Sequence, residues 1–300
     1  MRERTPAPVL RTAAEDLCDE DELLRMVSEA PPRSPARSSR GDQLYRVPPI
    51  YFIGDSRAVP FRNSLYVSEF TLRTYQLRSV HLRALHAADF YSPGNGLNLP
   101  LMNALATDMA VITRDEGARW AAEDEAAPLV LFCGLYDVLR VLDELGPDAA
   151  IPGWDAMSRR YDHGTTPASR TVSAEEAVQR AFARMEPLAT AIEALQAMGF
   201  VHIFVHGFPR ARRGERFQRL YGKLKARRQH DTNTLLKVHM LFDEVARSIA
   251  RRTSTRYVAG AVDANGEILE HVTEDYAHYN ARGVREVART IVSILEGVVE

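Results

Sequence analysis

The chain has 300 residues, of which 45% are hydrophobic and 26% charged, as in an ordinary globular protein. Its formal net charge of −2 provides no overall attraction to nucleic acid or to an anionic membrane surface. Because no segment approaches the roughly 18 apolar residues of a membrane helix, and the N-terminus lacks an apolar signal core, we expect a cytoplasmic protein that binds neither.

Residues 1–44 are predicted to be an appendage, and residues 45–300 a single catalytic domain. A short acidic amphipathic helix is expected at residues 13–30, followed by a linker at residues 31–41. The linker is rich in Pro, Ser and Arg, and such a composition cannot bury enough apolar surface to order itself. The sequence leaves open whether this helix docks on the body or on a partner.

The body alternates strand-like and helix-like segments. Apolar runs predict strands at residues 50–53, 128–133, 201–206 and 257–262. Helical spacing predicts helices at residues 98–114, up to 145, 173–198, 231–252 and 284–295. Ser173 is expected to cap the third of these helices, with Glu176 three residues later. Residues 65–67 and 71–77 can form short strands of an insertion. The alternation predicts an α/β fold, with a parallel sheet covered by helices on both faces.

The first predicted strand ends abruptly in Gly54, Asp55 and Ser56. Ser56 therefore follows the carboxyl end of a central strand, where open α/β sheets bind their ligands. A tight turn at this place can expose a serine hydroxyl as a nucleophile. The three residues alone also occur in many turns that have no catalytic role.

A second segment, before the last helix, places Asp275 three residues ahead of His278. A serine nucleophile needs a base to accept its proton, and the base needs an acid that orients it and stabilises its charge. One short loop can supply both groups. The alternative for this segment alone is that Asp275 caps the helix and His278 lies on the surface.

Together these two segments resemble the SGNH/GDSL hydrolase family, esterases and acyl-transfer enzymes with a flavodoxin-like, three-layer αβα fold. The family begins with a strand and Gly-Asp-Ser, and ends with Asp-x-x-His followed by polar and glycine residues, here Asn280 and Gly283. The resemblance implies a catalytic triad of Ser56, His278 and Asp275. It also implies oxyanion donors from Ser56 and from Gly96, about forty residues later.

The third block of the family is atypical in this chain. After the strand at residues 128–133, Gly134 and Asp137 fit the family pattern Gly-x-Asn-Asp, but Tyr136 stands where the family has Asn. That Asn side chain is one of the usual oxyanion donors, so Tyr136, Asn95 or Asn98 would have to replace it. We expect Asp55, Arg57 and Gly134, in or beside the motifs, to bind substrate. His206 is expected to join them because it lies at the carboxyl end of a predicted strand, and the alternative is a loop histidine with no role.

The resemblance implies hydrolysis of an ester or acyl thioester through an acyl-enzyme, without a cofactor. Two alternatives stay open: an acyltransferase with the same triad, and a catalytically impaired module that binds a ligand. We expect no metal site, because His202 and His206 lie about 13 Å apart along a strand. We also expect no disulfide between Cys18 and Cys133.

The segment from Arg210 to Arg228 is dense in basic residues, with apolar residues at helical spacing between them. Such a pattern is typical of a solvated helix face with one apolar stripe. The alternative is a basic lid that binds an anionic group, such as a phosphopantetheine thioester, a carrier protein or an acidic sugar. The sequence does not predict the oligomeric state.

Overall fold

The computed structural model describes residues 47–62, 64–82, 86–92, 94, 96–98, 101, 127–146, 149–151, 170–208, 232–263, 267–273 and 278–298. For residues 232–236 it describes the backbone. The predicted appendage, most of the predicted helix at 98–114, Asn95, the basic segment Arg210–Arg228 and Asp275 lie outside the described residues.

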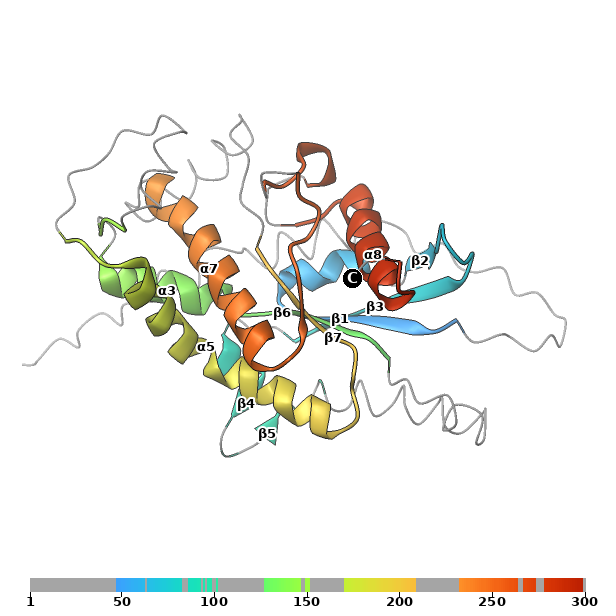
Figure 1. Ribbon diagram of the computed structural model, residues 1–300, viewed down its shortest axis with the longest axis horizontal. Helices are drawn as coiled ribbons and strands as arrows, with labels where there is room; N and C mark the ends of the chain where they lie inside the picture. Colours follow the sequence, from blue (N-terminus) through green and yellow to red (C-terminus); the bar gives the residue numbers. More distant parts are fainter. Residues whose placement is uncertain are drawn as a thin grey trace, which may run out of the picture.

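A six-stranded sheet forms the centre of the molecule (Figure 1). Its strands in spatial order are β2 (Ser64–Val67), β3 (Thr74–His81), β1 (Pro49–Gly54), β6 (Leu129–Phe132), β7 (Ile203–His206) and β8 (Arg256–Val258). All neighbouring strands are parallel except β2, which runs antiparallel to β3 at the edge. The parallel strands therefore follow the order 2-1-3-4-5, which is the flavodoxin-like order, and the predicted fold class is confirmed.

Helices cover both faces of the sheet, as Figure 1 shows. On one face lie α3 (Leu135–Leu145), α5 (Ala174–Ala197) and α7 (Thr232–Arg252), which pack against one another. On the other lie α8 (Ala281–Leu295) and the short 3-10 helix η1 (Ser56–Phe61). The remaining elements are η2 (Ala87–Asp89), η3 (Glu270–Val272) and a two-stranded ladder of β4 (Tyr91–Ser92) and β5 (Gly96–Leu97).

The central strands are continuous apolar runs because both of their faces are buried. Side chains alternate between the two cores along each strand. In β1, Phe52 packs on the α8 side and Ile53 on the opposite side. In β6, Phe132 likewise packs on the α8 side and Leu131 on the opposite side. The sheet thus separates two apolar cores, and its carboxyl edge is free to carry polar residues.

The region expected to be an insertion forms part of the main sheet instead. β3 pairs with β1 in parallel from Gln76 to His81, along the whole of β1, so it is an integral strand. Residues 68–73 form the turn between β2 and β3, closed by the N–H of Ser68 donating to the carbonyl of Arg73 at 2.8 Å. Only Tyr75 and Leu77 of β3 are buried. This weak alternation explains why the sequence did not predict the strand clearly.

The ends of the other elements agree with the sequence to within a few residues. Ser173 caps α5 as predicted, since its hydroxyl accepts from the N–H of Glu176 at 3.0 Å. β8 is shorter than the predicted strand at 257–262, because Gly260, at φ +84°, turns the chain out of the sheet. Among the described residues, no helix has the length and apolarity required to span a bilayer.

One carboxylate fixes the β2–β3 turn to the end of α8. Glu296 accepts hydrogen bonds from the hydroxyls of Ser68 at 2.6 Å, Thr71 at 2.5 Å and Tyr75 at 3.0 Å. Burial alone would raise the pKa of Glu296, but these hydrogen bonds outweigh it and lower the pKa. The turn is therefore held firmly against the helix that follows the predicted base.

Candidate active site

The turn after β1 places Ser56 at the carboxyl edge of the sheet. Gly54 has φ +141°, and a Cβ atom there would overlap the carbonyl oxygen of Phe132 on the neighbouring strand. Only glycine fits this close approach. The N–H of Asp55 then donates to the same carbonyl at 3.0 Å, and Leu82 donates to the carbonyl of Gly54 at 2.9 Å. Ser56 follows as the first residue of η1, half-buried.

Asp55 and Arg57, on either side of the serine, form a buried ion pair. The carboxylate of Asp55 caps η1 by accepting from the N–H of Arg57 at 3.0 Å, and accepts from its Nε at 2.9 Å and Nη2 at 2.7 Å. The guanidinium lies over the rings of Phe132, Phe208 and Phe242. Burial lowers the pKa of Arg57, but Asp55 outweighs burial and raises it.

The two side chains are only 5% and 3% exposed and point toward each other. This corrects the substrate-binding role expected of Asp55 and Arg57 from the sequence. A group that is buried and paired in this way holds the backbone around Ser56, rather than meeting a ligand from solvent.

His278 lies directly beside the serine. Its Nε2 is 3.0 Å from the Oγ of Ser56, although 222 residues separate them in the chain. This is hydrogen-bond distance for a nucleophile and its general base. Both side chains are half-buried. The structure thus brings together two of the three predicted triad residues, and Asp275 lies outside the described residues.

The loop that carries His278 is closed at its neck. The hydroxyl of Thr273, which is fully buried, donates to the carbonyl of His278 at 2.7 Å. Thr273 also forms an antiparallel bridge with Tyr279. Asn280 then caps α8 by accepting from the N–H groups of Arg282 at 2.9 Å and Gly283 at 3.1 Å. These bonds fix the backbone on both sides of His278.

Behind this loop, Tyr279 and His206 form a buried polar pair. The hydroxyl of Tyr279 lies 3.3 Å from Nε2 of His206 and is also hydrogen-bonded to the backbone of Ala261. Nδ1 of His206 is bonded to the carbonyl of Gly207, so it carries the proton, and Nε2 accepts from Tyr279. Burial, aided by the charge of Arg57, lowers the pKa of His206 to about 3. The imidazole is therefore neutral.

His206 does lie at the carboxyl end of a strand, as expected, but it is 2% exposed and stacks on Phe132 with ring centres 4.3 Å apart. This burial corrects the expected substrate-binding role and favours a supporting one. Sequence reasoning missed Tyr279 and Thr273. Their signal was their closeness to His278, but nothing in the sequence showed that they turn inward.

The residues expected to supply the third oxyanion donor have partners of their own. Tyr136 is 3% exposed, and its ring meets the ring of His86 edge-on at 6.1 Å. The amide of Asn98 donates to the carbonyl of Asp89 at 3.0 Å and accepts from the N–H of Leu101 at 3.1 Å. Gly96 is paired with Ser92 in the small ladder, and its N–H stays a predicted oxyanion donor.

Gly134 and Asp137 organise the start of α3 at the same edge of the sheet. Gly134 is the N-cap residue, close to Met185, and was expected to bind substrate. The carboxylate of Asp137 accepts from the backbone N–H of Ala87 at 2.7 Å and lies 3.1 Å from Nδ1 of His86. The hydrogen bond between Asp137 and Nδ1 of His86 raises the pKa of His86. Asp137 therefore anchors the segment that follows β3 beside the segment that carries Tyr136.

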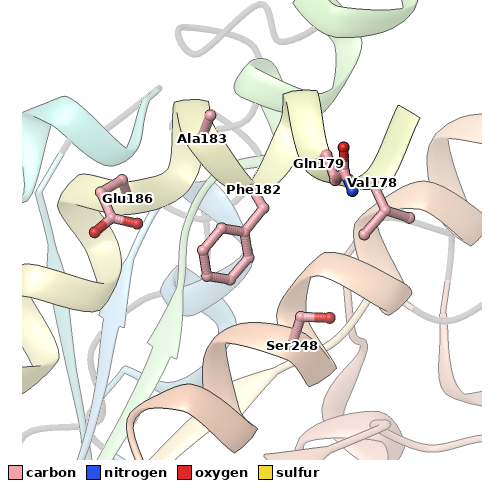
Figure 2. Close-up of a pocket in the computed structure, with 6 residues that line it drawn as sticks. All are labelled: Val178, Gln179, Phe182, Ala183, Glu186 and Ser248. Atoms are coloured by element: carbon pink, nitrogen blue, oxygen red, sulfur yellow. The ribbon is translucent and has the colours of Figure 1, made fainter. Parts of the chain in front are cut away.

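A shallow apolar hollow lies between α5 and α7 (Figure 2). The residues that line it are Val178, Gln179, Phe182, Ala183, Glu186 and Ser248. None of the predicted site residues contributes to it. Within the described ranges, no group of three His, Cys, Asp or Glu residues could hold a metal ion.

The chain is similar to some solved structures, but this similarity does not assign a function to its residues. No protein-family model matches the sequence, and none of the curated proteins matches it. Among solved structures, a GDSL-like lipase from Bacteroides thetaiotaomicron is 10% identical, with a TM-score of 0.38, over 95% of this chain and 100% of that one. Phospholipase A1 from Streptomyces albidoflavus is 13% identical, with a TM-score of 0.35, over 83% and 99%. Likeness at this level transfers no residue role.

Proposed function

We propose that the protein is a serine hydrolase of the SGNH/GDSL type, acting on an ester or an acyl thioester. The observation that carries this proposal is the 3.0 Å contact between Ser56 Oγ and His278 Nε2. It occurs at the carboxyl edge of a sheet with the 2-1-3-4-5 order, where this fold binds ligands. The motifs that carry the family resemblance, Gly-Asp-Ser and Asp-x-x-His, contain these same two residues.

In the proposed reaction, Ser56 Oγ attacks the substrate carbonyl while His278 Nε2 accepts the hydroxyl proton. Asp275 would hold the His278 ring in the tautomer with a free Nε2 and stabilise its positive charge. His278 then donates the proton to the departing alcohol or thiol, and an acyl-enzyme ester remains on Ser56. Water, deprotonated by His278, attacks this ester and regenerates the free serine.

The negative oxygen of each tetrahedral intermediate needs hydrogen-bond donors. We propose the backbone N–H of Ser56, the N–H of Gly96 and a third donor from Asn95 or Tyr136. The ion pair of Asp55 and Arg57 supports the first of these, because it fixes the backbone at the start of η1.

The direct test is the substitution Ser56→Ala, assayed on a chromogenic ester of a short acyl chain. Loss of a nucleophile from such a triad lowers the turnover number by a factor of about 10⁴ to 10⁶. Ser248→Ala, in the hollow between α5 and α7, is the matched control and should keep full activity. Full turnover by Ser56→Ala would refute the serine mechanism.

Two variants of the proposal are separated by experiment. An acyltransferase would use the same acyl-enzyme but pass the acyl group to an added alcohol faster than to water. A catalytically impaired binding module is favoured by Tyr136, which replaces the usual Asn donor and is buried. Such a module would bind an ester without turnover.

A basic lid at Arg210–Arg228 that binds an anionic part of the substrate is a separate possibility. It would be detected as a substrate KM that rises with the salt concentration.

A further inference from the structure

The side chains of His86 and Asp137 meet across the carboxyl end of β1. In the sheet, Gly54 at the end of β1 pairs with His81 of β3 on one side and with Phe132 of β6 on the other. His86 and Asp137 each lie five residues beyond these partners, and Nδ1 of His86 is 3.1 Å from the carboxylate of Asp137. Because β3 and β6 are about 10 Å apart with β1 between them, this contact spans the strand end that leads into the proposed nucleophile.

A buried thiol connects this pair to the turn that carries Ser56. Cys133 follows β6 directly and is 2% exposed. Burial raises the pKa of its thiol most, and the charges of Asp137 and Asp55 raise it further. Both carboxylates therefore lie near the same thiol, and Asp55 immediately precedes Ser56 in the chain. The pair of His86 and Asp137 thus belongs to the same part of the carboxyl edge as the proposed nucleophile.

His86 is fixed by its backbone, while part of its side chain reaches solvent. Its N–H donates to the carboxylate of Asp89 at 2.8 Å, and the N–H of Ala87 donates to Asp137 at 2.7 Å. The side chain is 28% exposed. A carboxylate only accepts, so Nδ1 of His86 carries a proton toward Asp137. Among the described residues, Nε2 has no hydrogen-bond partner, which leaves this atom to meet a ligand.

On the basis of the serine mechanism proposed above, we propose that His86 is the third oxyanion donor, through the Nε2–H of its imidazolium. The position where the family has the donating Asn is occupied by Tyr136, which is 3% exposed. The ring of His86 meets the ring of Tyr136 edge-on, with centres 6.1 Å apart, so His86 lies beside the position that lacks its donor. An imidazolium makes a charge-assisted hydrogen bond to an oxyanion, which is stronger than one from a neutral amide.

The surroundings of His86 favour the charged ring that this role requires. The hydrogen bond to Asp137 raises its pKa most; burial opposes this, the charges of Asp137 and Asp89 add to it, and Arg140 lowers the pKa, with a net rise. A neutral ring with its proton on Nδ1 could only accept at Nε2. The donor is therefore present below the raised pKa and is lost as the pH rises through it. His86 keeps its proton throughout the reaction and stabilises the developing charge.

The test measures kcat and KM on a chromogenic ester of a short acyl chain, as a function of pH. Removing one oxyanion donor lowers kcat by about 10² to 10³, so His86→Ala should lose this factor with KM nearly unchanged, because the oxyanion forms only during the reaction. His86→Gln places an amide N–H near the position of Nε2. It should recover part of this loss and should lack the decline of kcat that wild type shows at alkaline pH.

Two further variants separate this role from a structural one. Asp137→Asn removes the charge that holds the imidazolium, so the alkaline decline of kcat should move to lower pH. His202→Ala, just before β7 at the amino end of that strand, is the matched control and should keep the wild-type profile. If His86→Ala does not fold, as judged by circular dichroism, the pH profiles of His86→Gln and Asp137→Asn decide the question. An alkaline decline that His86→Gln retains unchanged overturns the proposal.

The remaining outcomes separate this proposal from the serine mechanism on which it rests. Full turnover by Ser56→Ala refutes the mechanism itself. An inactive Ser56→Ala, together with a folded His86→Ala that keeps wild-type kcat, overturns only the role of His86. In that case a hundredfold loss of kcat in Tyr136→Phe or Asn95→Ala would assign the third donor to the substituted residue.

Discussion

The buried His206 makes the stability of this protein depend on pH in a defined window. The imidazole has a folded-state pKa of about 3, against 6.5 for the free side chain. Between these values the unfolded chain binds a proton at this site and the folded protein does not, so stability falls as the pH falls from about 6.5 toward 3. Integrated from about pH 7.5 to pH 5, the loss from this one group is about 2 kcal/mol in the free energy of unfolding.

Urea denaturation at these two pH values measures the loss. Other titrating groups contribute too, so the informative quantity is the difference between wild type and His206→Gln, whose stability should fall by about 2 kcal/mol less. His202→Gln, four residues earlier and partly exposed, is the matched control and should behave as wild type. An equal pH dependence of wild type and His206→Gln would refute the reasoning that His206 is buried in the neutral form.

Three further predictions follow from the described contacts. Asp55→Ala leaves the Arg57 charge buried without its partner and should lower the free energy of unfolding by about 3–5 kcal/mol. Adding Arg57→Met should recover part of this loss. If the effects of the two substitutions in thermal melts simply add, the ion pair is contradicted. Tyr279→Phe removes the hydroxyl that donates to Nε2 of the buried His206, so the free energy of unfolding measured in urea should fall by about 1–3 kcal/mol, and an unchanged stability would contradict the buried polar pair. The folded-state pKa of Glu296 is lowered, so the stabilising effect of this carboxylate is present above its unfolded pKa and is lost as the pH falls. Glu296→Gln should therefore destabilise the protein at pH 7 and differ little from wild type near pH 3.

The sequence predicts the fold well wherever a strand is buried on both faces. The runs around Phe52, Phe132 and Phe204 are apolar throughout, and the structure has β1, β6 and β7 there. β3 was less clear because only one of its faces is buried, so polar residues interrupt the run. A short strand at residues 65–67 was expected and β2 lies there, but its antiparallel place at the edge of the main sheet was not, since its exposed Leu65 and Val67 look like core residues in the sequence.

For the candidate site, the sequence predicts which residue types come together but not which of them face inward. Ser56 and His278 lie in contact because two separate turns converge on one edge of the sheet. Asp55 and Arg57 flank Ser56 in the sequence and His206 ends a strand at the same edge, yet their side chains point into the interior. The direction of a polar side chain depends on packing between segments distant in sequence, which local patterns do not contain.

The central claim, that Ser56 is a nucleophile activated by His278, is tested most directly by covalent labelling with a fluorophosphonate. Such a reagent reacts with an activated serine rather than with an ordinary hydroxyl. The account predicts a single adduct at Ser56 by peptide mass spectrometry, and labelling at least a hundredfold slower in His278→Gln. An unlabelled Ser56 in folded protein, or equal labelling of His278→Gln, would contradict it.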